Sequence, residues 1–306
     1  MTLRANSGET PALAVARPRV RRQALGMAAE RMIKLPNGVE VPALGQGTWR
    51  MAETPARRSD ELAALQAGID LGLTLIDTAE MYADGATETL VGEAIAGRRD
   101  DVFLVSKVRP ENATARGTIA ACERSLRRLG TDHLDLYLLH WRGDVPLVET
   151  LAAFVTLTIA GKIRSWGVSN FGVDDMAELG RIAGAASIQT NQVLYNLTRR
   201  GIEWDLLRQA RARRLPIMAY SPIEQGRLLD HPVLARIADR HDATPAQIAL
   251  AWVLQQDNVL AVAKAGTVAH VQENHGALAI RLTAFELTEL DAAFPPPVER
   301  TPLETL

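Results

Sequence analysis

One unit recurs along this chain: an apolar run, a polar loop, an amphipathic stretch with helical period, and a glycine or polar turn. Several of the apolar runs are nearly continuous, which is typical of parallel strands that are buried on both faces. Strands that alternate with helices form βαβ units and a parallel sheet. The apolar runs that we interpret as strands cover residues 43–49, 73–77, 102–107, 134–140, 163–170, 186–192, 216–221 and 259–264. Eight such units predict an α/β fold, a (β/α)₈ TIM barrel.

Local signals support these boundaries. The segment 32–44 predicts a β-hairpin with Asn37-Gly38 at its tip, because this pair favours positive φ angles, and we expect it to close the bottom of the barrel. Thr244-Pro245 with Gln247 predicts a capped helix start, and Thr283 with Glu286 predicts another. The glycines that we expect to end helices in the left-handed conformation are Gly72, Gly97, Gly130 and Gly161.

The chain of 306 residues is compatible with one barrel plus insertions, and no linker divides residues 31–306 into two domains. Residues 1–30 are rich in arginine and have no steady period, so we expect a disordered N-terminal extension. An upstream start codon would also explain them. Arg21-Arg22 faintly resembles a twin-arginine export signal, but Glu30 and Arg31 cut the following apolar stretch short.

Composition excludes several classes of partner. Lys and Arg total 34 and Asp and Glu total 36, and this balance argues against nucleic acid or an anionic membrane as the main partner. The sequence contains no run of about 18 apolar residues, so it predicts no membrane-spanning helix. The single cysteine, Cys122, lies in a helical pattern and is interpreted as a buried structural thiol. We expect a cytoplasmic protein that acts as a monomer.

Every predicted strand ends in polar side chains that its own packing does not require. In a (β/α)₈ barrel the C-terminal ends of the strands converge on one mouth, where such enzymes place their sites. The polar residues at these ends are Thr48, Asp77, Lys107, His140, Ser169-Asn170, Gln192, Tyr220-Ser221 and Lys264. Their position predicts a site at the mouth.

Four residues at this mouth suit carbonyl reduction. Asp77 and Lys107 end neighbouring strands and can form a buried ion pair. Tyr82 follows Asp77 in the loop, and a nearby cation would lower the pKa of its phenol toward the range of efficient proton donation. His140 can donate a hydrogen bond to a carbonyl oxygen. Each residue alone also has a structural interpretation, as an ion pair, a loop anchor or a core histidine.

The motifs that contain these residues occur in a specific order. They read GQGTW, LIDTAEMY, VSK, LYLLHW, GKIRSWGVSNF, NQVLYN, AYSP and KAGTVAHVQEN. The chain therefore resembles the aldo-keto reductase superfamily over residues 31–293, and is most similar to a bacterial branch with methylglyoxal-reductase-like members. The resemblance implies a catalytic tetrad of Asp77, Tyr82, Lys107 and His140, and reduction of small aldehydes and ketones with hydride from NADPH.

The cofactor site does not follow the Rossmann pattern, because Gly45-x-Gly47 lacks the third glycine. The barrel offers instead the corner after its seventh and eighth strands, where a short helix can receive an anion. The resemblance implies that Tyr220 stacks on the nicotinamide, that Lys264 binds the 2′-phosphate, and that Glu273 and Asn274 contact the adenine. Glu273 and Asn274 could equally belong to an ordinary exposed helix face. The further cofactor contacts that we expect are Gly47, Thr48, Ser169, Asn170, Gln192, Ser221, Ile223, Gln225, Gly226, Ala265, Gly266, Thr267 and His270.

Three residues depart from the pattern of many relatives. Ala263 replaces a proline, Ala265 replaces a phosphate-binding serine, and His270 stands where an arginine often meets the 2′-phosphate. An imidazole is mostly neutral near pH 7, so this contact lacks a firm charge. NADPH remains favoured through Lys264, and use of NADH as well is an open alternative.

The expected substrate contacts are Trp49, Tyr82, His140 and Trp141, with Trp49 and Trp141 open to interpretation as packing residues. The loop after His140 is short and the C-terminal tail is modest, so we expect an open pocket and favour methylglyoxal-like substrates. We assign Trp166, Trp204 and Trp252 to the core.

Two other functions compete with this prediction. The barrel could serve as a cofactor-binding sensor or subunit without useful turnover, since a fold does not determine a function. The second competing function is metal-assisted hydrolysis. One histidine and one carboxylate at the mouth are too few ligands for a metal ion, so we expect no metal. The sequence leaves the physiological substrate open.

Overall fold

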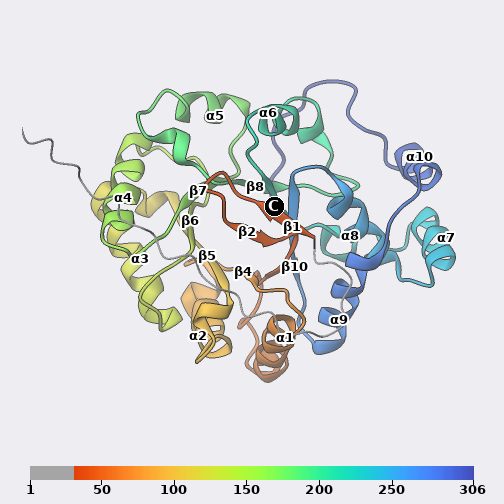
Figure 1. Cartoon of the computed structure of the whole chain (residues 1–306), viewed down its shortest axis with the longest axis horizontal. Coiled ribbons are helices and arrows are strands. Elements are labelled where there is room, and N and C mark those ends of the chain that lie inside the picture. Colours follow the sequence, from red (N-terminus) through yellow and green to blue (C-terminus); the bar gives the residue numbers. More distant parts are fainter. Residues whose placement is uncertain (1–30) are drawn as a thin grey trace, which may run out of the picture.

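The computed structural model describes residues 31–306, whose main sheet is a closed barrel of parallel strands. The strands follow one another around the barrel in chain order, and the last pairs with the first. Figure 1 shows the helices arranged around this ring. The barrel strands are β3 (Leu44–Gly47), β4 (Leu75–Asp77), β5 (Phe103–Val108), β6 (Leu136–Leu139), β7 (Trp166–Ser169), β8 (Asn191–Leu194), β9 (Ile217–Tyr220) and β10 (Val259–Lys264). The predicted (β/α)₈ barrel is confirmed.

A helix follows each barrel strand, and two helices separate β9 from β10. The helices are α1 (Arg58–Asp70), α2 (Ala86–Ala94), α3 (Ala115–Leu129), α4 (Leu147–Ile159), α5 (Val173–Leu179), α6 (Leu206–Ala212), α7 (Pro232–His241), α8 (Pro245–Gln255), α9 (Val268–Gly276) and α10 (Ala284–Ala293). Short 3₁₀ turns include Tyr82–Gly85, Ala185–Ser187, Gly201–Glu203 and Glu224–Gly226.

The predicted helix caps are present. The hydroxyl of Thr244 accepts from the main chain of Gln247, whose side chain reaches back to the main chain of Thr244, and Thr283 with Glu286 does the same at α10. The four glycines that were expected to end helices all have positive φ angles. These caps satisfy main-chain groups that would otherwise lack partners at the helix ends.

The core lies between the barrel and its helices. Leu75, Leu104 and Leu136, from three adjacent strands, are fully buried. Phe154 of α4 stacks on Trp166 of β7 with ring centroids 5.6 Å apart. Burial of apolar surface is worth about 25 cal/mol per Å², so this layer is the main source of stability. The cysteine is part of it, and burial raises the pKa of Cys122 to about 12.

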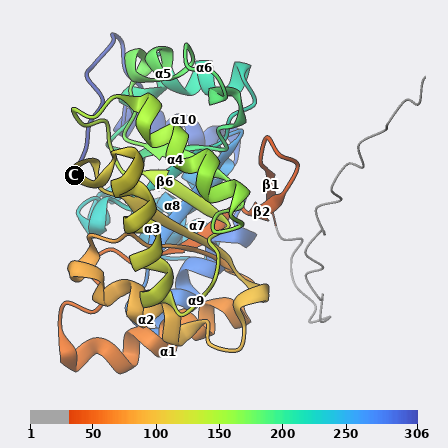
Figure 2. The same cartoon turned by 90° about the vertical axis from the view of Figure 1, so that its left-hand side faces the viewer.

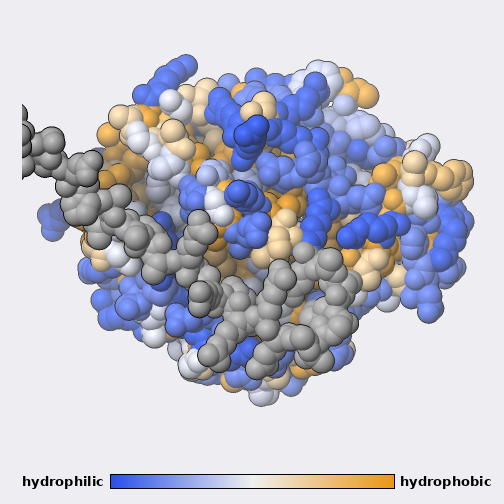
Figure 3. Space-filling view, in the orientation of Figure 1, coloured by the Kyte–Doolittle hydropathy of each residue, from blue (hydrophilic) through white to orange (hydrophobic). Residues whose placement is uncertain are grey.

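The hairpin of β1 (Met32–Lys34) and β2 (Glu40–Pro42) closes the N-terminal end of the barrel. Gly38 turns the chain with φ 88°. The main-chain N–H of Asn37 donates to the side chain of Gln189 just before β8, at 2.9 Å. Figure 2 shows the hairpin at the end opposite to the C-terminus, and Figure 3 shows its face as a mixture of hydrophilic and hydrophobic residues. The predicted position of the hairpin is confirmed.

Two expectations about local structure are wrong. The strand predicted at 186–192 is β8 at Asn191–Leu194, because Gly184 turns the chain with φ 87° into a 3₁₀ turn at Ala185–Ser187. Trp204 is not a core residue: it is 37% exposed, and the guanidinium of Arg208 lies over its ring. Trp166 and Trp252 are buried as predicted.

The extension predicted for residues 1–30 lies outside the described residues. Among residues 31–306, no helix is long and apolar enough to cross a membrane. The same residues contain no group of three or more histidine, cysteine, aspartate or glutamate side chains that could hold a metal ion.

Candidate active site

A buried ion pair with a tyrosine forms the centre of the site. The ammonium of Lys107 lies 2.8 Å from the carboxylate of Asp77 and 3.2 Å from the phenol oxygen of Tyr82. It also donates to the main-chain oxygen of Thr78, at 2.9 Å. Lys107 is fully buried and Asp77 is 3% exposed. The three predicted residues are therefore in hydrogen-bonding contact.

The barrel geometry explains this contact. Asp77 ends β4, and Lys107 lies on the neighbouring strand β5, so both side chains lie near the C-terminal ends of the strands. Thr48 donates to the main-chain oxygen of Asp77 at 2.9 Å. The amide of Gln192 donates to the carboxylate of Asp77 at 2.8 Å. Asp77 thus receives donors from β5 and β8 and is fixed in one orientation.

The structure corrects the expected direction of one pKa. Burial raises the pKa of Tyr82 above its ordinary value, and this effect outweighs the opposing attraction of Lys107 for a phenolate. Burial alone would lower the pKa of Lys107, but Asp77 and Tyr82 raise it overall. Lys107 is therefore charged and Tyr82 is protonated at neutral pH.

His140 lies beside this group, directly after β6. Its ring makes an edge contact with the ring of Tyr82, with centroids 5.8 Å apart. Burial, together with the charges of Lys107 and Arg109, holds the pKa of His140 well below its usual value. Its Nδ1 atom has no hydrogen-bond partner among residues 31–306. His140 is thus a neutral imidazole that can donate one N–H.

A polar wall continues over the ends of β7, β8 and β9. The hydroxyl of Tyr220 donates to the side-chain oxygen of Asn170 at 2.9 Å, and the amide of Asn170 donates to the main-chain oxygen of His140 at 3.1 Å. The hydroxyl of Ser169 donates to the main chain of Gln192 at 2.9 Å. Burial raises the pKa of Tyr220 to about 12, although a hydrogen bond with the main chain of Leu306 acts in the opposite direction and lowers this pKa.

The loop after β9 has a strained backbone and a buried anchor. Ser221, Glu224, Gln225 and Gly226 all have φ between 47° and 88°. Gln225 is exposed, and Ser221, Ile223 and Gly226 are half-buried. Only Glu224, which the sequence analysis did not select, is a buried charge in this loop, at 4% exposure. The strain and the anchor together define one conformation of the loop.

Glu224 receives hydrogen bonds from three side chains. The amide of Asn196 donates at 2.8 Å, Arg199 at 3.1 Å and Arg227 at 2.6 Å. Burial opposes its ionised form, but these donors hold the pKa of Glu224 below its usual value. No pattern in the sequence distinguishes Glu224 from an exposed loop residue, because its partners Asn196 and Arg199 lie after another strand.

The other corner of the mouth follows β10. Lys264 is exposed, and a Cβ atom on Gly266 would lie 2.9 Å from its ammonium, so the lysine lies over this turn. Thr267 caps α9, and His270 is exposed on the first turn. Ala265 and the predicted contact Asn274 are buried.

Glu273, the other predicted adenine contact, is half-buried and accepts a hydrogen bond from Thr244 at 2.7 Å. Its carboxylate therefore also ties α9 to the start of α8.

Two tryptophans follow the ends of β3 and β6. Trp141 and Trp49 are both half-buried, while Gly47 and Thr48 are buried at the end of β3. The rings of His140 and Trp141 lie 5.0 Å apart, and the guanidinium of Arg50 lies 4.5 Å from the ring centre of Trp49. Neither tryptophan is a core residue.

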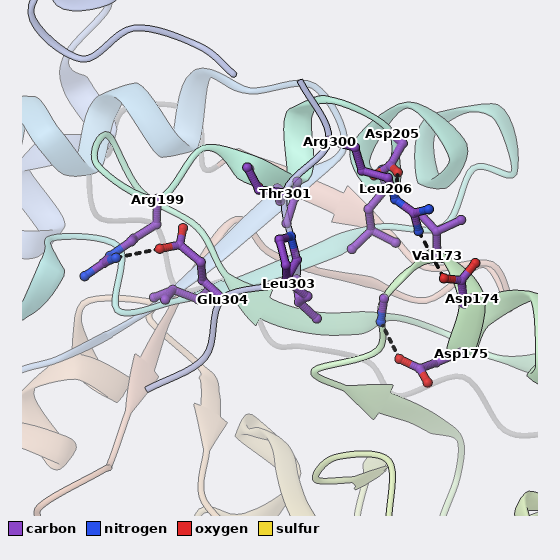
Figure 4. A pocket seen from close by; sticks show the side chains of 15 residues that line it. Val173, Asp174, Asp175, Arg199, Asp205, Leu206, Arg300, Thr301, Leu303 and Glu304 are labelled. Carbon is purple, nitrogen blue, oxygen red and sulfur yellow. Dashed lines mark hydrogen bonds and ion pairs between the residues drawn. The ribbon is translucent and has the colours of Figure 1, made fainter. Parts of the chain in front are cut away.

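The C-terminal tail packs against loops on the mouth side of the barrel. A cavity of about 540 Å³ lies between the tail and the loops after β7 and β8. Figure 4 shows the side chains that line it. Arg199 pairs with Glu304 of the tail at 2.5 Å, and Arg300 pairs with Asp174 and Asp205. Because Arg199 also binds Glu224, it connects the tail to the loop after β9.

Comparison with known proteins identifies the family. The model of the aldo/keto reductase family matches residues 43–294, which is most of the chain. The chain belongs to the aldo/keto reductase family. This confirms the resemblance that the sequence motifs indicated.

Curated relatives of this aldo/keto reductase include methylglyoxal reductase YeaE of Escherichia coli, which is 52% identical over 280 residues. That alignment covers 90% of this chain and 99% of the relative. Glyoxal reductase of Bacillus subtilis is 34% identical and covers 85% of this chain and 91% of its own length.

Among solved structures, an aldo/keto reductase from Klebsiella pneumoniae in complex with NADP and acetate matches with a TM-score of 0.89 and 50% identity. The match covers 91% of this chain and all of that chain. A second structure of an aldo-keto reductase from Klebsiella pneumoniae, in complex with NADPH, has the same TM-score and identity.

Proposed function

We propose that this aldo/keto reductase reduces small aldehydes and ketones, including methylglyoxal-like compounds, with hydride from NADPH and a proton from Tyr82. The observation that carries the proposal is the contact of Tyr82 with Lys107 at 3.2 Å, beside a Lys107–Asp77 pair at 2.8 Å. The relatives named methylglyoxal reductase and the related structures with NADP and NADPH support the same reaction.

The described residues at the mouth fit the cofactor NADPH, a nicotinamide adenine dinucleotide phosphate. Lys264 lies over the turn at Gly266, with its ammonium 2.9 Å from the place of a Cβ atom on that glycine. The start of α9 follows this turn, and its main-chain N–H groups favour an anion. Tyr220 and Asn170 form a polar wall beside Tyr82 and His140 that suits an amide-bearing ring. When bound, the cofactor supplies the hydride.

The protein supplies the proton and the electrostatics. The N–H of His140 donates to the carbonyl oxygen and orients it, and the phenol of Tyr82 gives its proton to this oxygen as negative charge develops there. The high pKa of Tyr82 keeps it in the donor form. Lys107 then stabilises the tyrosinate that remains, and Asp77 holds Lys107 in position.

The substrate class follows from what lies around the reacting oxygen. Trp49 and Trp141 offer half-buried aromatic surfaces, and the hydrogen bond that the Tyr82 hydroxyl makes within residues 31–306 comes from Lys107. We propose that the binding energy comes from the carbonyl and a short apolar chain. All four residues of the tetrad come from one barrel, so one copy of the chain suffices.

The experiment is NADPH oxidation measured against a panel of aldehydes that includes methylglyoxal. We expect Tyr82→Phe to lower kcat by about 10² to 10⁴ with little change in NADPH affinity, because only the proton donor is lost. Tyr137→Phe is the matched control, since the Tyr137 hydroxyl is buried without a hydrogen-bond partner among residues 31–306 and its ring makes an edge contact with Phe154 of α4.

Three outcomes would count against the proposal. Turnover that survives in Tyr82→Phe would exclude this tyrosine as the proton donor. Tight NADPH binding without oxidation by any aldehyde in the wild-type protein would support the sensor alternative. A clear preference for NADH over NADPH would overturn the proposed cofactor.

A further inference from the structure

The loop that carries Tyr82 has an unusual backbone. Directly after Tyr82, Ala83 has φ 46° and ψ 43°, Asp84 has φ 50° and ψ 36°, and Gly85 has φ 91°. For residues with a side chain the left-handed region is sterically unfavourable, and a run of them persists only where the surrounding structure holds it. Something beyond the loop must therefore fix the position of Tyr82.

A buried ionic cluster lies under this loop. Glu88, in the first turn of α2, is fully buried and accepts hydrogen bonds from Arg128 and Ser106, both at 2.6 Å. The side chain of Arg128 occupies the space where a Cβ atom of Gly85 would lie, 2.6 Å away. Arg128 comes from α3 and also donates to Ser125 at 3.3 Å. The end of the loop thus rests on Arg128, which Glu88 holds.

The cluster is attached to the strand that carries Lys107. Ser106 and Lys107 are consecutive residues of β5, so their side chains point to opposite faces of the barrel wall. On one face Lys107 contacts Tyr82, and on the other face Ser106 contacts Glu88. Tyr82 and Glu88 are the two ends of one short segment. One end is bound to Lys107 and the other to Ser106, which are adjacent residues of β5.

We propose that Glu88, with Arg128 and Ser106, is a positioning group that holds the hydroxyl of Tyr82 at its distance from Lys107. The inference rests on the proposed role of Tyr82 as proton donor. Glu88 touches no reacting atom, so its loss changes the rate of proton transfer rather than the binding of substrate or cofactor. A displacement of the proton donor of about 1 Å is enough to reduce catalysis strongly.

The test is the variant Glu88→Gln, which keeps the shape of the side chain and removes its charge. We expect kcat for methylglyoxal to fall about 10-fold, with KM and NADPH affinity within about twofold of wild type. We also expect a larger solvent deuterium isotope effect on kcat, because proton transfer becomes more rate-limiting. The groups that face Tyr82, namely Asp77, Lys107 and His140, are unchanged in this variant.

Two further variants keep the test decisive. Ser106→Ala removes one hydrogen bond of the cluster without a change in charge, and the same loss of kcat is expected if Glu88→Gln fails to fold. The matched control is Glu286→Gln, because Glu286 is also a buried carboxylate bound by a partly exposed arginine, Arg240, but joins α10 to α7 away from the mouth. We expect its kcat and isotope effect to equal those of wild type.

The outcomes separate this inference from the proposed function. If Tyr82→Phe is inactive while folded Glu88→Gln and Ser106→Ala keep the wild-type kcat and isotope effect, the positioning role is wrong and the proton donor stands. If Tyr82→Phe is active, the proposed function itself fails. Equal losses in Glu88→Gln and Glu286→Gln would indicate a general effect on stability and would overturn the inference.

Discussion

Burial controls the protonation states of the two residues that would act on a carbonyl oxygen. Tyr82 lies next to an ammonium, yet burial raises its pKa above the ordinary value. His140 lies near two cations and is buried, and both effects lower its pKa. The phenol therefore stays protonated and the imidazole stays neutral over the neutral pH range. Each residue is thus held in the form that donates a hydrogen bond or a proton.

This pair of shifts predicts a flat pH profile. As pH falls from about 8 to about 6, an ordinary histidine with a pKa of about 6.5 would become charged. The folded pKa of His140 is well below that value, and that of Tyr82 is above its ordinary value, so neither titrates in this window. We expect kcat/KM for aldehyde reduction to vary less than about twofold there. An acidic limb near pH 6.5 that disappears in His140→Gln would contradict this expectation.

At the scale of elements, the outer helices are joined by ionic contacts that involve their caps. Glu286 completes the capping box of α10 and also pairs with Arg240 at 3.1 Å and His241 at 3.0 Å of α7. Burial opposes its ionised form, but hydrogen bonds from Thr283, His241 and Arg240 lower the pKa of Glu286 to about 2. One carboxylate thus serves both the start of α10 and its contact with α7.

The variant Glu286→Gln therefore tests how much the Glu286 carboxylate contributes to the stability of the contact between α10 and α7. We expect the free energy of unfolding at pH 7 to fall by about 1 to 2 kcal/mol, because a charged acceptor with several donors is lost. The contribution of Glu286 is complete above its ordinary pKa of about 4.5 and is lost as pH falls toward about 2. Urea unfolding at pH 7 and near pH 3 measures it. A difference between variant and wild type that does not shrink at the lower pH would contradict the assignment.

At the scale of the whole molecule, segments that are far apart in the sequence contact one another at the mouth of the barrel. Gln192 reaches Asp77 across 115 positions of sequence, and Arg199 connects the loop after β9 to Glu304 of the tail. The proposed cofactor corner lies at the end of β10, next to β3 in the closed barrel. We therefore expect a ligand that spans the mouth to contact both halves of the barrel and to stabilise the folded state.

Binding of the proposed cofactor should raise the thermal midpoint. A ligand at 100 times its Kd adds about 2.7 kcal/mol, and we expect a larger rise with NADPH than with NADH at equal concentration. Lys264→Met removes the proposed charged contact to the 2′-phosphate, so NADPH should lose about 1.4 kcal/mol of this stabilisation and NADH none. Lys34→Met, on the hairpin at the opposite end, is the control. Equal rises with both cofactors in wild type would argue against a role for Lys264.

Several parts of the site were beyond sequence reasoning. Glu88 and Glu224 occur in ordinary-looking segments, and only the coordinates reveal that both are buried anchors of loops at the mouth. The strand with Gln192 was placed too early, because 186–192 has a strand-like composition but follows a turn at Gly184. For Glu88 and Glu224 a contact with a distant segment decided the outcome, and for the strand a local turn did.

The sequence by itself determined the barrel and the meeting of Asp77, Tyr82, Lys107 and His140, because periodicity defines the strands and parallel strands bring their ends to one edge. Only the tertiary structure decided the direction of the pKa of Tyr82 and the contact of Gln192 with Asp77. Burial and distance depend on segments far apart in the chain, and no local pattern contains them.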